Sequence, residues 1–416
     1  MSGLRSVEEQ LALVLSSARA LPTTTLPLAE ASGRTLRELV RARVDIPVFD
    51  NSAMDGFAVR WADVRDASPK APARLRVVAD LPAGTPLDPP LAPGEAARIM
   101  TGSPVPTDAD AIVPFEDTVG GLADSLGEIV VTAAPAGPGT FVRRRGSDTA
   151  VGDEILPAGV ELRALQLAAA AAAGVAAVVV SERPRVAIVS TGSELRAPGS
   201  RLERGQIPDS NGELLTALAT ENGCEVVLRE TVPDGVDGGG DGPTRAIAEA
   251  TARGAHVVVF SGGVSAGAYE VVKNTLSGTM QFARVAMQPG KPQGFGVTGD
   301  GMLLFGLPGN PVSAAVSFEV FVRPALLALQ GRMPVTRPLV RLPAATAWRT
   351  PPGRRQYLPA TVDRSDPAQW TVAPATTGGS ASHLAGGLAR ADAYAVVPAE
   401  VDAIAAGDLV DVMLIS

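Results

Sequence analysis

The chain lacks most of the residues that build disulfide frameworks and transition-metal sites. Its 416 residues include one cysteine, Cys224, and two histidines, so an intrachain disulfide is excluded and a zinc or iron site is disfavoured. Long apolar runs are also missing, because the longest, Leu167–Val180, is too short to span a bilayer. That run predicts a buried helix leading into a strand. The first ten residues carry charges and no apolar core, so no signal peptide is expected and a soluble cytoplasmic protein is predicted.

Basic residues are in deficit, and lysine is nearly absent. The formal net charge of -8 argues against a nucleic-acid partner held by phosphate neutralisation. Among 36 basic residues only Lys70, Lys273 and Lys291 are lysines, and the rest are arginines. Because arginine occupies nearly every basic position, a lysine at one of them indicates a need for a compact ammonium ion there, with chance retention as the alternative.

Secondary-structure signals change character along the chain. Ser6 and Glu9 fit a capping box that opens a helix running to about Ala20. Short strands separated by glycine and proline predict a small β-rich domain up to about Arg145. From Arg185 to Gly331 strands alternate with helices, which predicts right-handed βαβ crossovers and a mostly parallel sheet. The remainder of the chain is expected to be β-rich.

Three loops in the alternating segment carry the residue types of phosphate sites. They cover residues 191–194, 261–267 and 307–313, and each follows a predicted strand. Ligands of open α/β sheets bind beyond the carboxyl ends of the strands, and glycine-rich loops let backbone N–H groups approach an anion. Ordinary tight turns between strands and helices are the alternative for any one loop, but three together indicate a phosphate-bearing ligand.

Carboxylates accompany these loops, at Glu194, Asp209, Asp234 and Glu270. Acidic groups beside a phosphate are unfavourable unless a cation lies between them, and Mg²⁺ is the cation that bridges the two. Two alternatives stay open. Asp209 could be a turn or capping residue just before a helix capped by Asn211, and Glu194 and Glu270 could be solvated loop residues.

A serine-hydrolase interpretation competes with the phosphate site. The segment from Gly263 to Gly267 matches a nucleophile elbow with Ser265 at its centre, and Asp363 or Asp366 and then His383 follow in the order of a triad. Ser265, however, lies several residues beyond the strand end, and no HGGG-type loop is present. The hydrolase therefore remains a distant alternative.

Seven motifs together resemble the MoeA family of molybdopterin molybdenumtransferases and the related E domain of gephyrin. The match covers nearly the whole chain. The motifs are DNSAMDGFAVR (50–60), RIMTGSPVP (98–106), RRRGSD (143–148), STGSEL (190–195), SGGVSAGAYEVVK (261–273), QPGKPQGFG (288–296) and LPGNPVSA (307–314).

The resemblance implies an elongated homodimer and an α/β multidomain fold. It implies a central three-layer α/β/α molybdopterin-binding domain at 183–331, an N-terminal linking domain at 1–46 and 147–182, a β-rich inserted domain at 47–146, and a β-barrel-like C-terminal domain at 332–416. The implied reaction takes adenylylated molybdopterin and molybdate, requires Mg²⁺, and yields molybdenum cofactor and AMP. Other proteins of molybdenum-cofactor biosynthesis are an expected class of partner, whereas nucleic acid and membrane are not.

Site residues are carried over by motif position. The implied site lies between the central domain of one subunit and the β-rich inserted domain of the other. Implied catalytic residues are Asp55, Asp148, Glu194, Asp234 and Glu270, of which Glu194, Asp234 and Glu270 would hold Mg²⁺ or orient the diphosphate. Implied binding residues are Thr101, Thr191, Gly192, Ser261, Gly262, Gly263, Ser265, Lys273, Arg284, Lys291, Pro308, Gly309, Asn310, Pro311, Ser313, Arg354 and Ser382.

Departures from the family pattern concern charge. Glu270 stands where the family usually has Asp, Gln288 replaces a lysine, and Arg284 stands where a lysine is common. A C-terminal arginine of the family aligns with Pro359, so Arg354 or Arg355 is the expected substitute.

A paralogue that only binds or adenylylates molybdopterin is one alternative, and a gephyrin-like binding scaffold is another. The long N-terminal region and the C-terminal domain favour insertion over the first. Nothing in the sequence suggests the extra linker and domain that the second requires.

Overall fold

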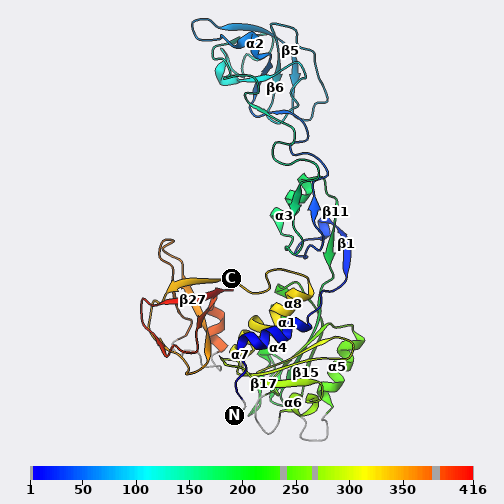
Figure 1. The fold of residues 1–416 in the computed structure, drawn as a ribbon, viewed down its shortest axis with the longest axis vertical. Helices are drawn as coiled ribbons and strands as arrows, with labels where there is room; N and C mark the ends of the chain where they lie inside the picture. The colour runs from blue at the N-terminus through cyan, green and yellow to red at the C-terminus, as the bar shows by residue number, and fades with distance from the viewer. Residues whose placement is uncertain (1–2, 235–240, 265–269, 377–384, 416) are drawn as a thin grey trace.

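The protein is elongated and consists of four modules (Figure 1). The computed structural model describes residues 3–234, 241–264, 270–376 and 385–415. A distal β module lies at one end of the long axis, and a narrow linking module connects it to a broad base. The base is formed by a central α/β module and a C-terminal β module. The chain runs out to the distal module and returns, so segments distant in sequence pair in the linking module.

The distal module is a five-stranded sheet in the order β7-β4-β6-β5-β8. Its core is formed by Phe57, Ile129 and other buried side chains, and the rings of Phe57 and Phe115 meet edge to face at 5.2 Å. A Cβ at Gly56 would lie 2.1 Å from the Val113 carbonyl oxygen, so this strand pairing needs glycine. Its elements are β4 (Gly56–Val59), α2 (Trp61–Val64), β5 (Ala73–Leu81), β6 (Glu95–Ile99), β7 (Ala111–Pro114), η2 (Phe115–Asp117) and β8 (Glu128–Val131).

The linking module pairs the outgoing chain with the returning chain. β1 (Thr23–Pro27) is antiparallel to β11 (Ala177–Ser181), and β2 (Val40–Arg41) to β10 (Glu154–Leu156). The helix predicted within 167–180 forms as α3 (Ala164–Ala172) and leads into β11, but it is not buried. Of its residues only Ala170 is buried, since the helix covers a small core with one face. Its remaining element is η1 (Leu28–Glu30), and the pair β3 (Asn51–Ser52) and β9 (Val142–Arg143) belongs to the distal module.

The central module is a three-layer sandwich around a six-stranded sheet in the order β15-β12-β16-β20-β19-β17. The four strands from β15 to β20 are parallel, whereas β19 and β17 are antiparallel to their neighbours, so the sheet is mixed. Its strands are β12 (Arg185–Thr191), β15 (Glu225–Val232), β16 (Val257–Ser261), β17 (Met280–Arg284), β19 (Pro292–Val297) and β20 (Leu303–Leu307), with a small pair β13 (Leu195–Arg196) and β14 (Ile207–Pro208).

Alternate residues of the central strands enter cores on opposite faces of the sheet. Ile188 packs with α1, α4, α7 and α8 on one face, and Ala187 packs with α5 and α6 on the other. The predicted capping box opens α1, because Ser6 Oγ accepts from the Glu9 N–H at 3.0 Å and the Glu9 carboxylate accepts from the Ser6 N–H at 2.8 Å. The helices are α1 (Val7–Ser17), α4 (Ser210–Glu221), α5 (Gly242–Ala252), α6 (Val271–Leu276), α7 (Pro311–Ser317), the π-helix η3 (Phe318–Val322) and α8 (Arg323–Leu329).

The continuous helix Pro311–Leu329 is long and apolar enough to cross a membrane by composition, with a mean hydropathy of 1.7. Of its apolar 18-residue window, 89% is buried inside the protein, and the helix contributes Val316, Phe321 and Leu326 to the core under the sheet. Its apolar surface is therefore covered by the central module itself.

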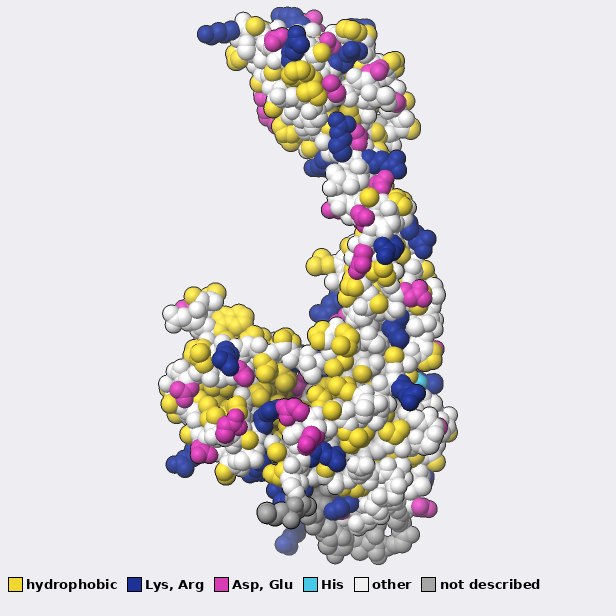
Figure 2. All heavy atoms as spheres, in the orientation of Figure 1, with side chains coloured by type: hydrophobic (Ala, Val, Ile, Leu, Met, Phe, Trp, Pro, Cys, Tyr) yellow, Lys and Arg dark blue, Asp and Glu magenta, His cyan; other side chains and the backbone are white. Residues whose placement is uncertain are grey.

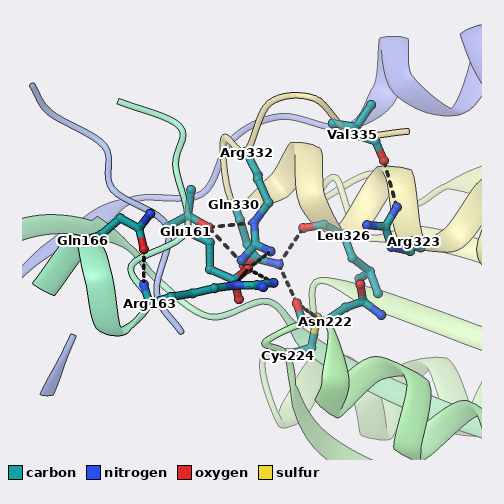
Figure 3. A network of polar contacts seen from close by, with 11 residues as sticks. Glu161, Arg163, Gln166, Asn222, Cys224, Arg323, Leu326, Gln330, Arg332 and Val335 are labelled. Atoms are coloured by element: carbon teal, nitrogen blue, oxygen red, sulfur yellow. Dashed lines mark hydrogen bonds and ion pairs between the residues drawn. The ribbon is translucent and has the colours of Figure 1, made fainter. Parts of the chain in front are cut away.

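A polar network joins the linking module to the end of α8 (Figure 3). The Gln330 amide donates to the backbone oxygens of Asn222, at 2.9 Å, and Leu326, at 3.1 Å. Arg332 forms an ion pair of 3.2 Å with Glu161 of the linking module, and Arg163 contacts the same carboxylate. These contacts tie the linking module to the sheet that carries the site.

The C-terminal module has a six-stranded sheet in which one strand comes from the central segment. β18 (Met287–Gln288) pairs in parallel with β23 (Arg355–Asp363), so the chain around Lys291 lies at the junction of two modules. The other elements are β21 (Leu339–Pro343), β22 (Trp348–Arg349), β24 (Thr371–Pro374), η4 (Ala385–Arg390), β25 (Ala393–Val397), β26 (Ala403–Ile404) and β27 (Leu409–Leu414).

Candidate functional site

A cavity of about 590 Å³ opens at the carboxyl ends of three parallel strands. β12 ends at Thr191, β16 at Ser261 and β20 at Leu307, and the pairing register sets these ends side by side. The position is the one that open α/β sheets use for ligands. The lining residues are Thr191, Glu194, Leu195, Ile207, Pro208, Asp209, Ser210, Asn211, Asp234, Ser261, Gly262, Gly263, Val264, Glu270, Gln288, Gly290, Lys291, Pro292, Pro308, Gly309, Asn310, Pro311, Ser313 and Arg354.

The first loop, at the end of β12, is fastened to the loop after β15. The Gly192 N–H donates to the Val232 oxygen at 3.0 Å, and the Ser193 N–H donates to the Asp234 carboxylate at 3.3 Å. A Cβ on Gly192 would lie 2.6 Å from a Glu194 carboxylate oxygen, so the Glu194 side chain folds back over this glycine. Glu194 and Asp234 are therefore held on one wall of the cavity.

The second loop needs its glycines. Gly262 has a φ of +94°, and a Cβ there would lie 2.7 Å from the Thr191 carbonyl oxygen. Its N–H donates to the Leu307 oxygen at 2.9 Å, while Thr191 Oγ1 donates to the Ser261 oxygen at 3.2 Å. The Thr191 hydroxyl thus links the first loop to the second, and a backbone hydrogen bond links the second to the third, which connects the loops at the floor of the cavity.

Asn211 ties the second loop to the third. Its Nδ2 donates to Ser261 Oγ and to the Gly309 oxygen, both at 2.6 Å, and the residue is 8% exposed. The sequence predicts Asn211 as the helix cap, and that prediction is wrong. Asp209 is the N-cap of α4, because its carboxylate accepts from the Gly212 N–H at 2.9 Å. The alternative of a capping role for Asp209 is therefore confirmed, although Asp209 also lines the cavity.

Lys291 and Arg354 form a cationic wall of the cavity that the acidic loops also line. The loop from Gln288 to Lys291 is held by Gln293, whose Nε2 donates to the Gly290 oxygen at 2.6 Å and to Ser317 Oγ at 2.7 Å. Desolvation by the surrounding protein lowers the pKa of the Lys291 ammonium from its ordinary value, and the nearby Arg284 and Arg354 lower it further.

Arg354 reaches the cavity and Arg355 does not line it. Arg354 Nη1 donates to Gln288 Oε1 at 2.7 Å, so the residue that replaces a family lysine holds this guanidinium against the cavity. Arg355 forms an ion pair of 2.5 Å with Glu8. Pro359 is buried within β23 opposite Tyr394. Of the two arginines proposed from the sequence, Arg354 is the one in the site.

The structure brings most of the sequence-predicted residues to this cavity. Gly192 belongs to its first loop, and Lys273 and Arg284 line a second cavity that shares Lys291 with the first. Ser265 and Ser382, together with His383, lie outside the described residues. Those that line the first cavity are Thr191, Glu194, Asp234, Ser261, Gly262, Gly263, Glu270, Lys291, Pro308, Gly309, Asn310, Pro311, Ser313 and Arg354.

Asp55, Thr101 and Asp148 are remote from the cavity of their own chain. The Thr101 N–H and hydroxyl donate to the Asp55 carboxylate at 2.6 and 2.7 Å, and these hydrogen bonds hold the pKa of Asp55 below its ordinary value. The two residues belong to the distal module, and Asp148 is exposed where the chain returns from it. The space-filling view shows that module separated from the base by a narrow column (Figure 2).

The acidic residues fit a metal that the substrate helps to bind. Glu194, Asp234 and Glu270 line one cavity, yet no three Asp, Glu, His or Cys side chains in the described part of the chain are grouped as a metal site. Mg²⁺ usually takes one or two carboxylates together with substrate phosphates and waters. The donor set therefore suits Mg²⁺ shared with a phosphate ligand rather than a cation enclosed by protein.

The hydrolase alternative gains no support from the described residues. Asp363 accepts a hydrogen bond from the Ser365 N–H and Asp366 from the Ala368 N–H, both at 2.9 Å. Each carboxylate thus serves a local turn of the C-terminal module, and neither lines the cavity.

Three family models match the chain in order. They are the MoeA N-terminal region (domain I and II) over residues 5–174, the probable molybdopterin binding domain over 187–328, and the MoeA C-terminal region (domain IV) over 341–415.

Individual proteins are similar along most of the chain. Molybdopterin molybdenumtransferase 2 of Mycobacterium tuberculosis is 42% identical over 412 residues, covering 97% of this chain and 98% of that protein. A molybdopterin molybdenumtransferase of Nostoc is 39% identical over 314 residues, covering 74% of this chain and 70% of that one. The crystal structure of the molybdopterin biosynthesis MoeA protein from Pyrococcus horikosii has a TM-score of 0.80 at 31% identity and covers all of both chains.

Proposed function

Because the chain belongs to the MoeA family of molybdopterin molybdenumtransferases, we propose that it inserts molybdate into adenylylated molybdopterin and releases AMP with the help of Mg²⁺. The observation that carries the proposal is one cavity whose lining includes both carboxylates, from Glu194, Asp234 and Glu270, and cations, from Lys291 and Arg354. Molybdate and the diphosphate are both anionic, and cleavage of the diphosphate develops further negative charge that the site has to stabilise.

The residues of the chain divide this work. Lys291 and Arg354 attract the oxyanions, and the glycine loops at 261–263 and 307–311 let backbone groups approach a phosphate. Glu194, Asp234 and Glu270 would hold Mg²⁺ together with the substrate, and the ion would neutralise charge on the diphosphate oxygens. The pairing of β18 with β23 close to Lys291, together with the hydrogen bond from Arg354 to Gln288, would hold the two cations in place to orient the anion.

The reaction is tested by mixing the purified protein with adenylylated molybdopterin, Mg²⁺ and molybdate. Molybdate-dependent AMP release is expected, and Glu194→Gln should suppress it. Glu221→Gln, an exposed residue at the end of α4, is the matched control and should retain the activity. AMP release that is equally fast without molybdate would contradict insertion and favour a paralogue that acts on the adenylate alone.

The cationic wall has its own test. Lys291→Ala should weaken molybdate binding because it removes an ammonium from the cavity, whereas Lys70→Ala should not, because Lys70 is exposed in the distal module. Equal effects of the two substitutions would contradict the role given to Lys291.

We also propose that a homodimer completes the site, with Asp55, Thr101 and Asp148 of one subunit facing the cavity of the other. The remoteness of these residues from the cavity of their own chain supports this arrangement. Inactive Asp55→Ala and Glu194→Ala variants should regain activity when unfolded and refolded together, since half of randomly paired dimers are mixed and each mixed dimer has one intact site. About a quarter of the wild-type activity is therefore expected, and no recovery would contradict the shared site.

The division of the chain into 1–46 with 147–182, 47–146, 183–331 and 332–416 is part of the proposal. Buried cores confined to the distal, linking and C-terminal modules support it. The core on one face of the central sheet also takes in Val7 and Val14 of α1 and Tyr357 and Tyr394 of the C-terminal segment, so α1 packs with the central module. A cytoplasmic location is proposed because the sequence has a single cysteine and disulfide bonds are rare in cytoplasmic proteins. Cell fractionation tests the location.

A further inference from the structure

The N-terminal segment of the chain is bonded to the loop that leads to Lys291. Arg5 forms an isolated parallel bridge with Val285. In this bridge the Arg5 N–H donates to the Arg284 oxygen at 2.9 Å, and the Arg5 oxygen accepts from the Ala286 N–H at 2.8 Å. The Val285 N–H in turn donates to the Lys291 oxygen at 2.7 Å and so closes the loop at its base. Arg5 therefore holds both chain neighbours of the residue that closes this loop.

A ring of contacts extends from this bridge to the C-terminal module. The Ala286 oxygen accepts from the Arg355 N–H at 3.0 Å, and Arg355 Nη1 donates to the Glu8 carboxylate at 2.5 Å. Glu8 lies in the first turn of α1, three residues after Arg5, and α1 lies in the base of the molecule (Figure 1). The ring thus passes through three segments that are distant in the sequence. Because it is closed, a shift of any one segment against the other two breaks a bond.

Both cations of the first cavity are attached to this ring. Lys291 is bonded through its backbone oxygen to Val285, and Arg354 is the chain neighbour of Arg355. The two cations come from different modules, yet they line the same cavity. Their spacing therefore depends on how firmly the segments of the ring are held together.

Packing of α1 alone does not account for these contacts. Val7 and Val14 already place one face of the helix in the core under the sheet. Arg5 precedes the helix, and its guanidinium donates at 2.7 Å to the side-chain oxygen of Gln10, a residue that is only 2% exposed. The residues in front of the helix are thus fixed in addition to the helix itself.

We propose that Arg5 and Glu8 are positioning residues that set the spacing of Lys291 and Arg354 for an oxyanion. Neither of them lines the cavity, so Arg5 acts through its backbone hydrogen bonds and Glu8 acts through Arg355. Cations that are held in place before the anion arrives bind it at a lower cost in ordering. The inference rests on the proposed function for the identity of the anion, molybdate.

The test measures molybdate binding to the full-length protein by calorimetry. Arg5→Pro removes the N–H that donates to the Arg284 oxygen, and it should weaken molybdate binding by about two- to tenfold, the equivalent of one hydrogen bond. Arg5→Ala keeps this donor and should weaken binding less. Gly3→Pro is the matched control, because it introduces the same residue where an added Cβ meets no described atom within 4 Å.

The pH dependence of binding separates positioning from a loss of folded protein. Desolvation lowers the pKa of Lys291, and the nearby Arg284 and Arg354 lower it further. A looser loop admits water and separates the cations, so in Arg5→Pro the pKa of Lys291 should rise and the fall in molybdate affinity should move to higher pH. A smaller folded fraction would instead reduce the binding capacity at every pH and leave the position of the fall unchanged.

The role of Glu8 is tested through its partner. Glu8→Gln and Arg355→Gln should each weaken molybdate binding by about two- to fivefold, the scale of a partly exposed ion pair. Because both substitutions break the same contact, the double variant should bind molybdate no more weakly than Arg355→Gln alone. Losses that add in the double variant would contradict the route from Glu8 through Arg355.

The outcomes separate this inference from the proposed function. A folded Arg5→Pro variant with the molybdate affinity and pH dependence of Gly3→Pro would overturn the inference. If the wild-type protein also shows molybdate-dependent AMP release in that case, the proposed function is preserved. A wild-type protein that binds molybdate, with the expected loss in Arg5→Pro, but releases no AMP would refute the function and preserve the positioning role.

Discussion

Replacing Asn211 with alanine should loosen the floor of the cavity more than it weakens the fold. The side chain donates at 2.6 Å to Ser261 Oγ and at 2.6 Å to the Gly309 oxygen, and so connects the loops after β16 and β20. Alanine removes both donors and leaves the backbone of α4 intact. Asn211→Asp keeps the shape of the side chain and also removes the donors.

The magnitude follows from the two bonds. A net hydrogen bond contributes roughly 0.5–1.5 kcal/mol, so the pair is worth about 1–3 kcal/mol. The Ser261 side is buried, with 2% exposure, and its hydroxyl loses a hydrogen-bond partner. Gly309 is exposed, so water can satisfy its carbonyl oxygen. We therefore expect the free energy of unfolding to fall by about 2 kcal/mol.

The effect on the reaction should be larger. Without Asn211 the loop at 307–311 can shift relative to Gly262, and a displacement of about 1 Å in a positioning group can cost on the order of a hundredfold in rate. Urea titrations followed by circular dichroism measure the stability change, and molybdate-dependent AMP release measures the rate. Thr220→Ala, on the exposed face of the same helix, should alter stability by less than about 0.5 kcal/mol.

A specific result would refute this reasoning. If Asn211→Ala and Asn211→Asp both match the Thr220→Ala control in urea midpoint and in rate, the other hydrogen bonds between the loops hold them in place. The Asn211 amide would then not be needed to connect them. If stability falls while the rate is unchanged, the amide stabilises the fold without positioning the substrate.

Three further outcomes are expected. Anion binding needs the Lys291 ammonium, which predominates only below its pKa. Because that pKa is lowered, molybdate affinity should fall with rising pH at a lower pH than an ordinary lysine titrates. Measured in the same way, Lys291→Arg should remove this early fall. Gly262→Ala should lower the urea midpoint by the equivalent of about 1–3 kcal/mol, because φ is +94° and the new Cβ would meet Thr191 backbone, whereas Gly299→Ala, in open space, should not. Burial raises the pKa of the Cys224 thiol to about 12, so iodoacetamide should label it at pH 8 only after unfolding, and rapid labelling of the native protein would contradict its burial.

The strand ends of the central sheet could be predicted from local sequence. RVAIVS, HVVVF and the run before Leu307 are short, apolar and followed by glycine, and they form β12, β16 and β20. Because parallel strands place their carboxyl ends at one edge, the strand pattern alone predicts that Glu194, Gly262 and Gly309 lie close together.

Pairing between distant segments could not be predicted in the same way. The reversal of β19, between β20 and the edge strand β17, leaves no local signal, since a reversed strand has the same apolar pattern as a parallel one. The link from Asn211 to Ser261 and Gly309 depends on tertiary contact. The N-cap of α4, by contrast, could have been predicted from the sequence. Asp209 directly precedes the first helical residue, and aspartate is among the preferred N-cap residues.

The strand that β18 contributes to the C-terminal sheet has a practical consequence for anyone shortening the protein. A chain cut after residue 331 would leave Met287 and Gln288 without the hydrogen-bonding partners Arg355 and Gln356. Bare strand edges invite pairing with other molecules. The central portion expressed by itself is therefore expected to be prone to self-association, and it would also have lost the guanidinium that Gln288 steadies.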